Sequence, residues 1–254
     1  MRGRSTGTAP LLEPLAYPGP QPATGGIVTA EGFLAVERAR FDRALDGLGV
    51  PVMTERPPVL AIGSNACVSQ VQAKFETVAA CERVVPLEPT TSHDVVAGVS
   101  AHVSRPGYVP ATPIPAPGER RKLFVLWLSG AQIALLDRTE PNYDRVELSR
   151  RYVPELELPA GTTCQVYVSE HGWLVDRNGV ARRLVPQREL IGSLLGESDA
   201  LRALAGPTPE TWIARMQDAG VRSEARRIWR REERCAKAPP FRTGGGRATR
   251  ATAG

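Results

Sequence analysis

Several features that mark particular protein classes are scarce in this sequence of 254 residues. The four cysteines include no CxxC pair, so neither a zinc site nor a disulfide framework is indicated. The apolar, uncharged stretch over residues 123–136 has 14 residues, fewer than the roughly 20 that a membrane helix needs. The first residues lead into no apolar run of the signal-peptide type. We therefore expect a cytoplasmic protein that does not enter a membrane.

Lysine is also rare, because only three of the 32 basic residues are Lys. This bias toward Arg, together with abundant Ala, Gly and Pro, is typical of a GC-rich genome and says little about phosphate binding. The formal net charge of +5 comes from the C-terminal end, where residues 221–254 carry a surplus of seven positive charges and leave −2 for the preceding 220 residues. Nucleic acid is therefore not the expected partner. The alternative is an RNA- or DNA-associated protein that works through this basic end.

Composition and pattern divide the chain into five segments, and 42% hydrophobic residues are enough for a sizeable core. Residues 1–28, with five Pro, five Gly and no apolar period, predict a disordered arm. Apolar residues spaced like one face of a helix, ended by Gly49 and Pro51, predict a helical extension with a linker over residues 29–56. The remaining segments are a main domain over residues 57–186, C-terminal helices over residues 187–238 and a disordered tail over residues 239–254.

The main domain is predicted to consist mainly of short strands, most of them antiparallel to their neighbours. A strand over residues 58–62 ends in Gly63-Ser64-Asn65, and a helix then extends to about Ala80. Asn178-Gly179 is typical of a tight hairpin. Further strands are predicted over residues 94–103, 107–112, 123–128, 144–148 and 165–169.

One short helix in this domain has clear start and stop signals. Ser129 and Gln132 have the spacing of a capping box, which predicts a helix over about residues 131–138. Pro141 ends it, because proline disfavours the helical conformation at the preceding residue. Glu140 is therefore expected just beyond the C-terminus of this helix.

Two turns carry groups suited to chemistry. Gly63, Ser64 and Asn65 follow a strand and precede a helix, so they present consecutive backbone N–H groups, a hydroxyl and an amide. Such a turn can hold a carboxylate or an oxyanion. Glu140 presents a carboxylate that can act as a general acid or base. If the two turns meet, they form a site in which a carbonyl is polarised while a proton is moved.

Four blocks of the sequence resemble, in the same order, the pattern of the γ-glutamylcyclotransferase-like superfamily. The family pattern is a Tyr-Gly-Ser-Asn turn, an Ala-Thr strand followed by Pro-Gly, an apolar strand, and Leu-Asp-x-x-Glu with a following Tyr. The resemblance covers about residues 58–148. The matching blocks are Leu60-Ala61-Ile62-Gly63-Ser64-Asn65, Gly107-Tyr108-Val109-Pro110-Ala111-Thr112 followed by Pro117-Gly118-Glu119, Phe124-Val125-Leu126-Trp127, and Leu136-Asp137-Arg138-Thr139-Glu140 with Tyr143 nearby.

The resemblance implies an α+β fold: a small mixed, mostly antiparallel β-barrel with flanking helices, a pocket at one mouth, and helical extensions at both ends of the chain. Family members cleave γ-glutamyl amides without a metal or cofactor. The substrate's α-amine attacks its own γ-carbonyl, which releases an amine or amino acid and 5-oxoproline. A small-molecule γ-glutamyl compound is therefore the implied partner, whereas oligomeric state and leaving amine stay open.

Carried over by position, the resemblance assigns roles to six residues. Glu140 would take a proton from the α-ammonium and pass it to the leaving amine. Ile62 and Tyr143 would belong to the substrate-binding wall, although Ile62 stands where the family has Tyr, so a hydroxyl expected there is missing. The backbone N–H groups of the turn would bind the glutamyl moiety; these are the N–H groups of Gly63, Ser64 and Asn65.

Other interpretations of the same residues stay open. Glu140 can be an exposed turn carboxylate, and Ser64 and Asn65 can be simple cap and turn formers. The chain can also be a non-catalytic member of the fold that binds a carboxylate ligand or a protein. Ser64 lacks a GxSxG frame and is not expected to be a nucleophile. The histidines have no ligand spacing, so no metal site is expected; they are His93, His102 and His171.

Overall fold

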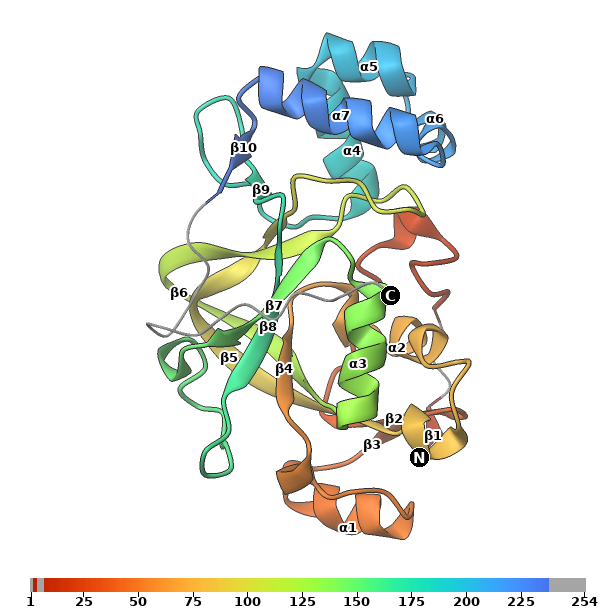
Figure 1. The fold of residues 1–254 in the computed structure, drawn as a ribbon, viewed down its shortest axis with the longest axis vertical. Coiled ribbons are helices and arrows are strands. Elements are labelled where there is room, and N and C mark those ends of the chain that lie inside the picture. Colours follow the sequence, from red (N-terminus) through yellow and green to blue (C-terminus); the bar gives the residue numbers. More distant parts are fainter. Residues whose placement is uncertain (1, 4–6, 238–254) are drawn as a thin grey trace.

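The computed structural model describes residues 2–3 and 7–237 and consists of one large sheet with helices around it (Figure 1). Seven strands follow the order β3-β2-β5-β6-β4-β8-β7, and the two-residue strand β1 (Arg2–Gly3) extends the β3 edge. Strand β4 pairs parallel with β8, and the other neighbours are antiparallel. The strands are β2 (Gly26–Thr29), β3 (Gly32–Ala35), β4 (Pro58–Ala61), β5 (Val85–Val99), β6 (Ala111–Trp127), β7 (Tyr143–Leu148) and β8 (Cys164–Ser169), with a separate pair of β9 (Trp173–Leu174) and β10 (Cys235–Ala236).

Helices cover the sheet in three groups. In Figure 1 helices α4 to α7 gather at one end of the molecule, α2 and α3 lie along one side of the sheet, and α1 lies at the other end. The helices are α1 (Phe41–Gly47), α2 (Val68–Lys74), α3 (Gly130–Thr139), α4 (Gln187–Glu197), α5 (Asp199–Ala205), α6 (Pro209–Arg215) and α7 (Ala219–Arg231). The C-terminal helices expected over residues 187–238 are confirmed as the short helices α4 to α7.

The core follows the two-residue period of the strands. In β4, Val59 and Ala61 belong to one apolar cluster and Leu60 belongs to another. Helices α2 and α3 add residues such as Val71 and Leu136 to the first cluster. Because successive side chains of a strand point to opposite faces, both faces of the sheet are buried. The strand that leads into the polar turn is therefore held from both sides.

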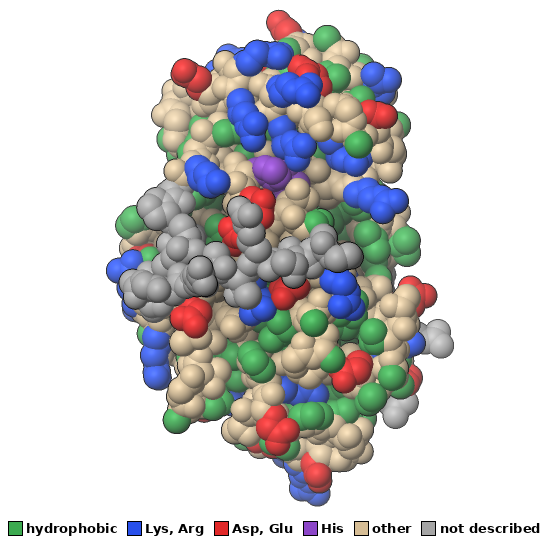
Figure 2. All heavy atoms as spheres, viewed as in Figure 1, with side chains coloured by type: hydrophobic (Ala, Val, Ile, Leu, Met, Phe, Trp, Pro, Cys, Tyr) green, Lys and Arg blue, Asp and Glu red, His purple; other side chains and the backbone are tan. Residues whose placement is uncertain are grey.

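The C-terminal helices form a third apolar cluster together with the end of β5, the loop that follows it and β9. Trp212 and Trp229 are both buried there, with ring centroids 6.2 Å apart. The indole N–H of Trp212 donates to the Gly107 carbonyl at 2.9 Å, which ties α6 to the loop before β6. The Lys and Arg side chains visible on this part of the surface stand among Asp and Glu side chains (Figure 2). In α7, Arg227 and Arg231 both pair with Glu224.

The α+β class and the mostly antiparallel sheet agree with the prediction, but no closed barrel forms over the described part of the chain. The two outer strands lie at opposite ends of the strand order and do not pair with each other. Strands β5 and β6 are long and pair along most of their length, with a register shift between His93 and Val95. The sheet therefore stays open, with the short β2–β3 hairpin on one flank.

The prediction of a disordered arm over residues 1–28 is wrong for residues 7–28. Tyr17 is 4% exposed and Ala9 is 5% exposed, so this part of the chain packs into the protein. The predicted helical extension over residues 29–56 is wrong in its first part, which forms the β2–β3 hairpin before α1 begins at Phe41. Strand β2 pairs with β5, and these backbone hydrogen bonds outweigh the weak helical pattern. The sheet thus begins before residue 57.

Three other expectations concern the C-terminal tail, membrane helices and metal sites. The tail over residues 239–254, like residues 1 and 4–6, lies outside the described residues. Within residues 7–237, no helix combines the length and the apolar character that crossing a bilayer requires. In the same part of the chain, His, Cys, Asp and Glu side chains do not gather into a group of three that could hold a metal ion.

Candidate functional site

Strand β4 delivers the polar turn (Gly63, Ser64 and Asn65) to the edge of a cavity. Ile62 and Ser64 are 7% exposed, and Ser64 begins the short 3₁₀ turn η4 (Ser64–Ala66). Position 63 requires glycine because Tyr17 packs against it: a Cβ atom there would lie 2.2 Å from the hydroxyl oxygen of Tyr17. No side chain larger than hydrogen fits at that point without moving Tyr17.

Helix α3 delivers Glu140 to the same cavity. The predicted capping box is present: the Ser129 hydroxyl accepts from the Gln132 backbone N–H at 3.2 Å, and the Gln132 amide oxygen accepts from the Ser129 N–H at 2.8 Å. The helix ends at Thr139, so Glu140 is its C-cap residue. The capping box therefore fixes where α3 begins, and Glu140 directly follows its last residue.

Asp137 anchors the C-terminal end of α3 to the sheet. Its carboxylate accepts from Arg145 Nε at 2.9 Å and from the Tyr167 hydroxyl at 2.6 Å. Burial alone would raise the pKa of Asp137, but the hydrogen bonds from Arg145 and Tyr167 outweigh it and lower that pKa. Because Arg145 and Tyr167 lie on β7 and β8, the end of α3 is attached to two strands.

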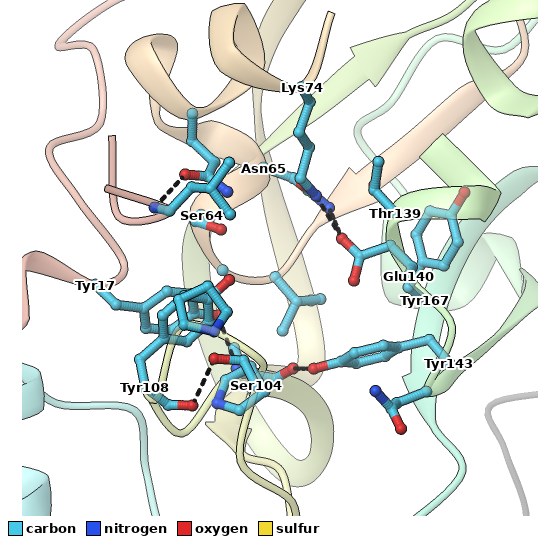
Figure 3. Close-up of a pocket in the computed structure, with 18 of the residues that line it drawn as sticks. Tyr17, Ser64, Asn65, Lys74, Ser104, Tyr108, Thr139, Glu140, Tyr143 and Tyr167 are labelled. Carbon is cyan, nitrogen blue, oxygen red and sulfur yellow. Dashed lines mark hydrogen bonds and ion pairs between the residues drawn. The ribbon is translucent and has the colours of Figure 1, made fainter. Parts of the chain in front are cut away.

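The two turns meet, although they are 75 positions apart in the sequence. Asn65 Nδ2 donates to Glu140 Oε1 at 3.4 Å. Lys74, the last residue of α2, donates from Nζ to the same Oε1 at 2.6 Å and to Asn65 Oδ1 at 2.8 Å. Figure 3 shows Lys74 and Asn65 directed toward Glu140. The three side chains form a closed cluster of amide, ammonium and carboxylate.

The cavity between these turns has a volume of about 450 Å³. All six residues that the sequence assigned to the site line it: Ile62, Gly63, Ser64, Asn65, Glu140 and Tyr143. The structure therefore brings together every one of them. It also shows that the Asn65 side chain is engaged with Glu140 and Lys74.

Other lining residues were not assigned to the site from the sequence; they include Tyr17, Lys74, His102 and Tyr108. Lys74 had a usable signal, since it is one of three lysines and stands nine residues after Asn65 on the predicted helix. Tyr17 had none, because its segment has the composition of a disordered arm. Its ring stacks on Tyr108 with centroids 4.3 Å apart and an interplanar angle of 13°.

Tyr143 lines the cavity, and its hydroxyl already forms a hydrogen bond within the protein. The hydroxyl donates to the Ala111 carbonyl at 2.7 Å, and the side chain is buried. Burial, followed by the neighbouring Tyr17 and Glu140, raises the pKa of Tyr143 well above its ordinary value. Tyr143 therefore stays a neutral phenol that braces the strand carrying Ala111.

His102 contributes a neutral imidazole to the cavity wall. Its Nδ1 lies 2.6 Å from the Ser100 hydroxyl, which in turn donates to the Ser169 hydroxyl at 2.7 Å. Burial, with His171 and Arg226 nearby, lowers the pKa of His102 well below its ordinary value.

The arrangement can polarise an acceptor group and move a proton. It offers the polar turn, the Glu140 carboxylate, the Lys74 ammonium and several neutral phenols around a single cavity. Comparison with protein-family models, with curated proteins and with solved structures finds no match to this chain. The family resemblance therefore stands on the residue blocks alone.

Proposed function

We propose that the protein is a γ-glutamylcyclotransferase-like enzyme that releases 5-oxoproline and an amine or amino acid from a γ-glutamyl compound. The observation that carries this proposal is the meeting of the polar turn and Glu140 in one cavity. The cavity of about 450 Å³ is within the usual size range of small-molecule sites. No metal or cofactor is part of the proposal.

The reaction needs one group that accepts a proton and later returns it. Glu140 Oε1 is held by Lys74 and Asn65, and among residues 7–237 no donor is bound to Oε2. In the proposed reaction Oε2 takes a proton from the substrate's α-ammonium. The free amine attacks the γ-carbonyl, and a new C–N bond closes the lactam ring. The old amide C–N bond then breaks as Glu140 returns this proton to the leaving nitrogen. The ring nitrogen gives up its second proton through the same carboxylate to the released amine, which leaves a neutral lactam and an ammonium product.

Such a sparse site is sufficient for this chemistry, since the nucleophile and the electrophile belong to one molecule. Well-oriented intramolecular reactions reach effective molarities of order 10⁵ to 10⁸ M. The protein has to fold the substrate, bind the carbonyl oxygen as it gains charge, and move protons from the attacking nitrogen to the leaving nitrogen. Lys74 acts here as a positioning residue, because it holds the Glu140 carboxylate at 2.6 Å.

A second candidate function is binding without turnover. It is favoured by the same ion pair, since Glu140 already holds a cation and their side chains are 10% and 17% exposed. In that case the cavity would hold a carboxylate ligand against Lys74 and the polar turn. The two candidates differ in whether a covalent product appears.

The test is a panel of γ-glutamyl amines, amino acids and peptides incubated with the protein, with 5-oxoproline detected by mass spectrometry. The proposal predicts stoichiometric release of 5-oxoproline and of the free amine from at least one compound. Thermal unfolding is followed with the same panel. Stabilisation by a panel compound without any 5-oxoproline would establish the binding function and overturn the enzyme proposal.

A further inference from the structure

The N-terminal segment (residues 9–19) contributes Tyr17 to the cavity although it lies outside the four family-like blocks. Leu11 donates its backbone N–H to the Gln70 amide oxygen at 3.0 Å, and Gln70 lies on α2. Leu11 and Tyr17 both line the cavity. The segment therefore forms part of the cavity wall, and Tyr17 is its buried residue at that wall.

The position of the Tyr17 phenol is fixed from three sides. Its oxygen accepts from the Ala111 backbone N–H at 2.7 Å, and the backbone of Ser64 forms a second hydrogen bond to it. Its ring stacks on Tyr108. Figure 3 shows the stacked pair on one side of the cavity and Glu140 on the other. Little freedom is left for the ring or for the oxygen.

The hydrogen bonds of this hydroxyl can be counted. A phenol has one proton to donate and an oxygen that accepts two hydrogen bonds. Backbone N–H groups of Ala111 and Ser64 use the acceptor positions. The Ala111 carbonyl is taken by Tyr143, and within the described chain no acceptor is bound to the Tyr17 proton. That proton is therefore available to a molecule in the cavity.

Two effects make the Tyr17 hydroxyl a good hydrogen-bond donor that stays protonated. Burial, followed by the neighbouring Tyr108, raises the pKa of Tyr17 above its ordinary value, so the phenol stays protonated. The two N–H groups that donate to its oxygen polarise the O–H bond, because hydrogen bonds in a chain strengthen one another. A neutral, polarised donor is suited to a carbonyl oxygen that gains negative charge.

We propose that Tyr17 is a substrate-binding and catalytic residue that donates a hydrogen bond to a carbonyl oxygen in the cavity. Building on the proposed function, that oxygen is the γ-carbonyl oxygen of the glutamyl group, opposite the nitrogen served by Glu140. Tyr17 also takes up the Ser64 N–H, so the hydroxyl acts in place of that backbone donor. The N-terminal segment is thereby a component of the site.

Tyr17→Phe tests this role, because it keeps the ring on Tyr108 and removes only the hydroxyl. The matched control is Tyr152→Phe, which removes a buried phenol that does not line the cavity. Turnover is measured with γ-glutamyl-alanine, and binding of 5-oxoproline is measured by calorimetry. We expect Tyr17→Phe to lower kcat about 100- to 1,000-fold and to weaken 5-oxoproline binding about 10-fold. The control should match the wild type in both.

The outcomes separate this inference from the proposed reaction. Release of 5-oxoproline at the wild-type rate by Tyr17→Phe overturns the role of Tyr17 and leaves the reaction standing. A wild-type protein that makes no 5-oxoproline but loses affinity for it in Tyr17→Phe supports the donor and overturns the reaction. A wild-type protein that neither binds nor releases 5-oxoproline overturns both.

A second replacement covers the case in which Tyr17→Phe fails to unfold cooperatively. Placing 3-fluorotyrosine at position 17 keeps the ring and the hydroxyl and makes the hydroxyl a stronger donor. Affinity for 5-oxoproline should then exceed the wild-type value. An unchanged affinity would show that the Tyr17 proton is not shared with the ligand and would overturn the inference.

Discussion

Two carboxylates in this protein lie in the walls of cavities and hold cations, yet they are bonded differently. Glu140 pairs with Lys74 at 2.6 Å beside the cavity of about 450 Å³. Glu88 pairs with Arg38 at 3.0 Å beside a hollow of about 530 Å³. Both side chains are largely buried, with 17% and 12% exposure. Volume, burial and an ion pair therefore do not distinguish them.

The distinction lies in the individual oxygens. Glu88 Oε1 is bound by Arg38, and its Oε2 accepts from the Trp127 indole N–H at 2.8 Å. Glu140 receives both of its donors on Oε1, and Oε2 has none among residues 7–237. A carboxylate with both oxygens satisfied holds the structure together. A carboxylate with one anchored and one open oxygen is oriented and still able to take a proton.

The largest expected effect is on turnover. Glu140→Gln keeps the size of the side chain but cannot accept a proton, so we expect release of 5-oxoproline to fall by about 10² to 10⁴. Glu88→Gln should leave the rate per folded molecule close to that of the wild type. Initial rates with one γ-glutamyl substrate give the comparison. Equal losses in both variants would remove the distinction between the two carboxylates.

The second effect is on stability. Here the loss of the Arg38–Glu88 pair should cost more than the loss of the Lys74–Glu140 pair. Arg38→Met leaves the buried Glu88 carboxylate without its cation and removes a guanidinium that lies over Phe41 and Trp127. We expect a loss of about 2 kcal/mol in the free energy of unfolding, because Arg38 is itself partly exposed. Lys74→Met should cost about 1 kcal/mol or less, since Glu140 keeps the hydrogen bond from Asn65 and lines a cavity large enough for water to solvate the carboxylate. Urea unfolding measures both, and a larger loss in Lys74→Met would contradict this order.

The third effect concerns the anchor of α3. Asp137→Asn should lower the free energy of unfolding by about 1 to 2 kcal/mol near neutral pH, because it weakens the hydrogen bonds with Arg145 and Tyr167. The folded pKa of Asp137 is lowered, so this stabilisation is present above the ordinary value of 3.8 and is lost as pH falls through the folded pKa. Unfolding curves of both proteins should converge in acid. A difference independent of pH would refute the charge-based explanation.

The smallest effect is the contribution of Glu88 to the pH dependence of stability. Burial raises the pKa of Glu88 despite Arg38 and Trp127. Its contribution to stability is therefore fully present below the ordinary value of 4.5 and is lost as pH rises through the folded pKa. Subtracting the melting temperatures of Glu88→Gln from those of the wild type across this range isolates the contribution. A difference that grows with pH would have the wrong sign.

Local signals in the sequence were sufficient to place Glu140, which is one half of the candidate site. Ser129, Gln132 and Pro141 set the bounds of α3 through short-range hydrogen bonds and backbone sterics, so Glu140 was placed at its end. That Glu140 would face Gly63 came from the family resemblance. The capping residues do not determine which distant turn faces a helix end, because that depends on the order of strands in the sheet.

Long-range pairing of strands explains the incorrect secondary-structure predictions. Residues 29–35 were assigned to a helix on a weak apolar pattern, but they belong to a hairpin in which β2 finds a partner in β5 about 60 residues later in the chain. Prolines hid the length of β6, where Pro113, Pro115 and Pro117 stand at alternate positions. Alternate N–H groups of a strand point away from a given partner, so these prolines remove no hydrogen bond to β5. Neither effect can be read from the local sequence.

Tyr17 was missed for a related reason. Segment composition estimates whether a stretch can bury enough surface by itself, and the first 28 residues cannot. The single ring of Tyr17 is buried because Tyr108, Ser64 and Ala111 are already in place to receive it. A segment that only completes a surface made by others has no periodic pattern of its own.

The most direct measurement is a crystal structure of the protein with 5-oxoproline bound in the cavity. The account predicts that the lactam N–H donates to Glu140 Oε2 while Lys74 and Asn65 stay on Oε1. Lactam bound away from Glu140, or Glu140 with both oxygens turned to protein donors in its presence, would contradict the central claim that this carboxylate keeps one oxygen open for the substrate's nitrogen.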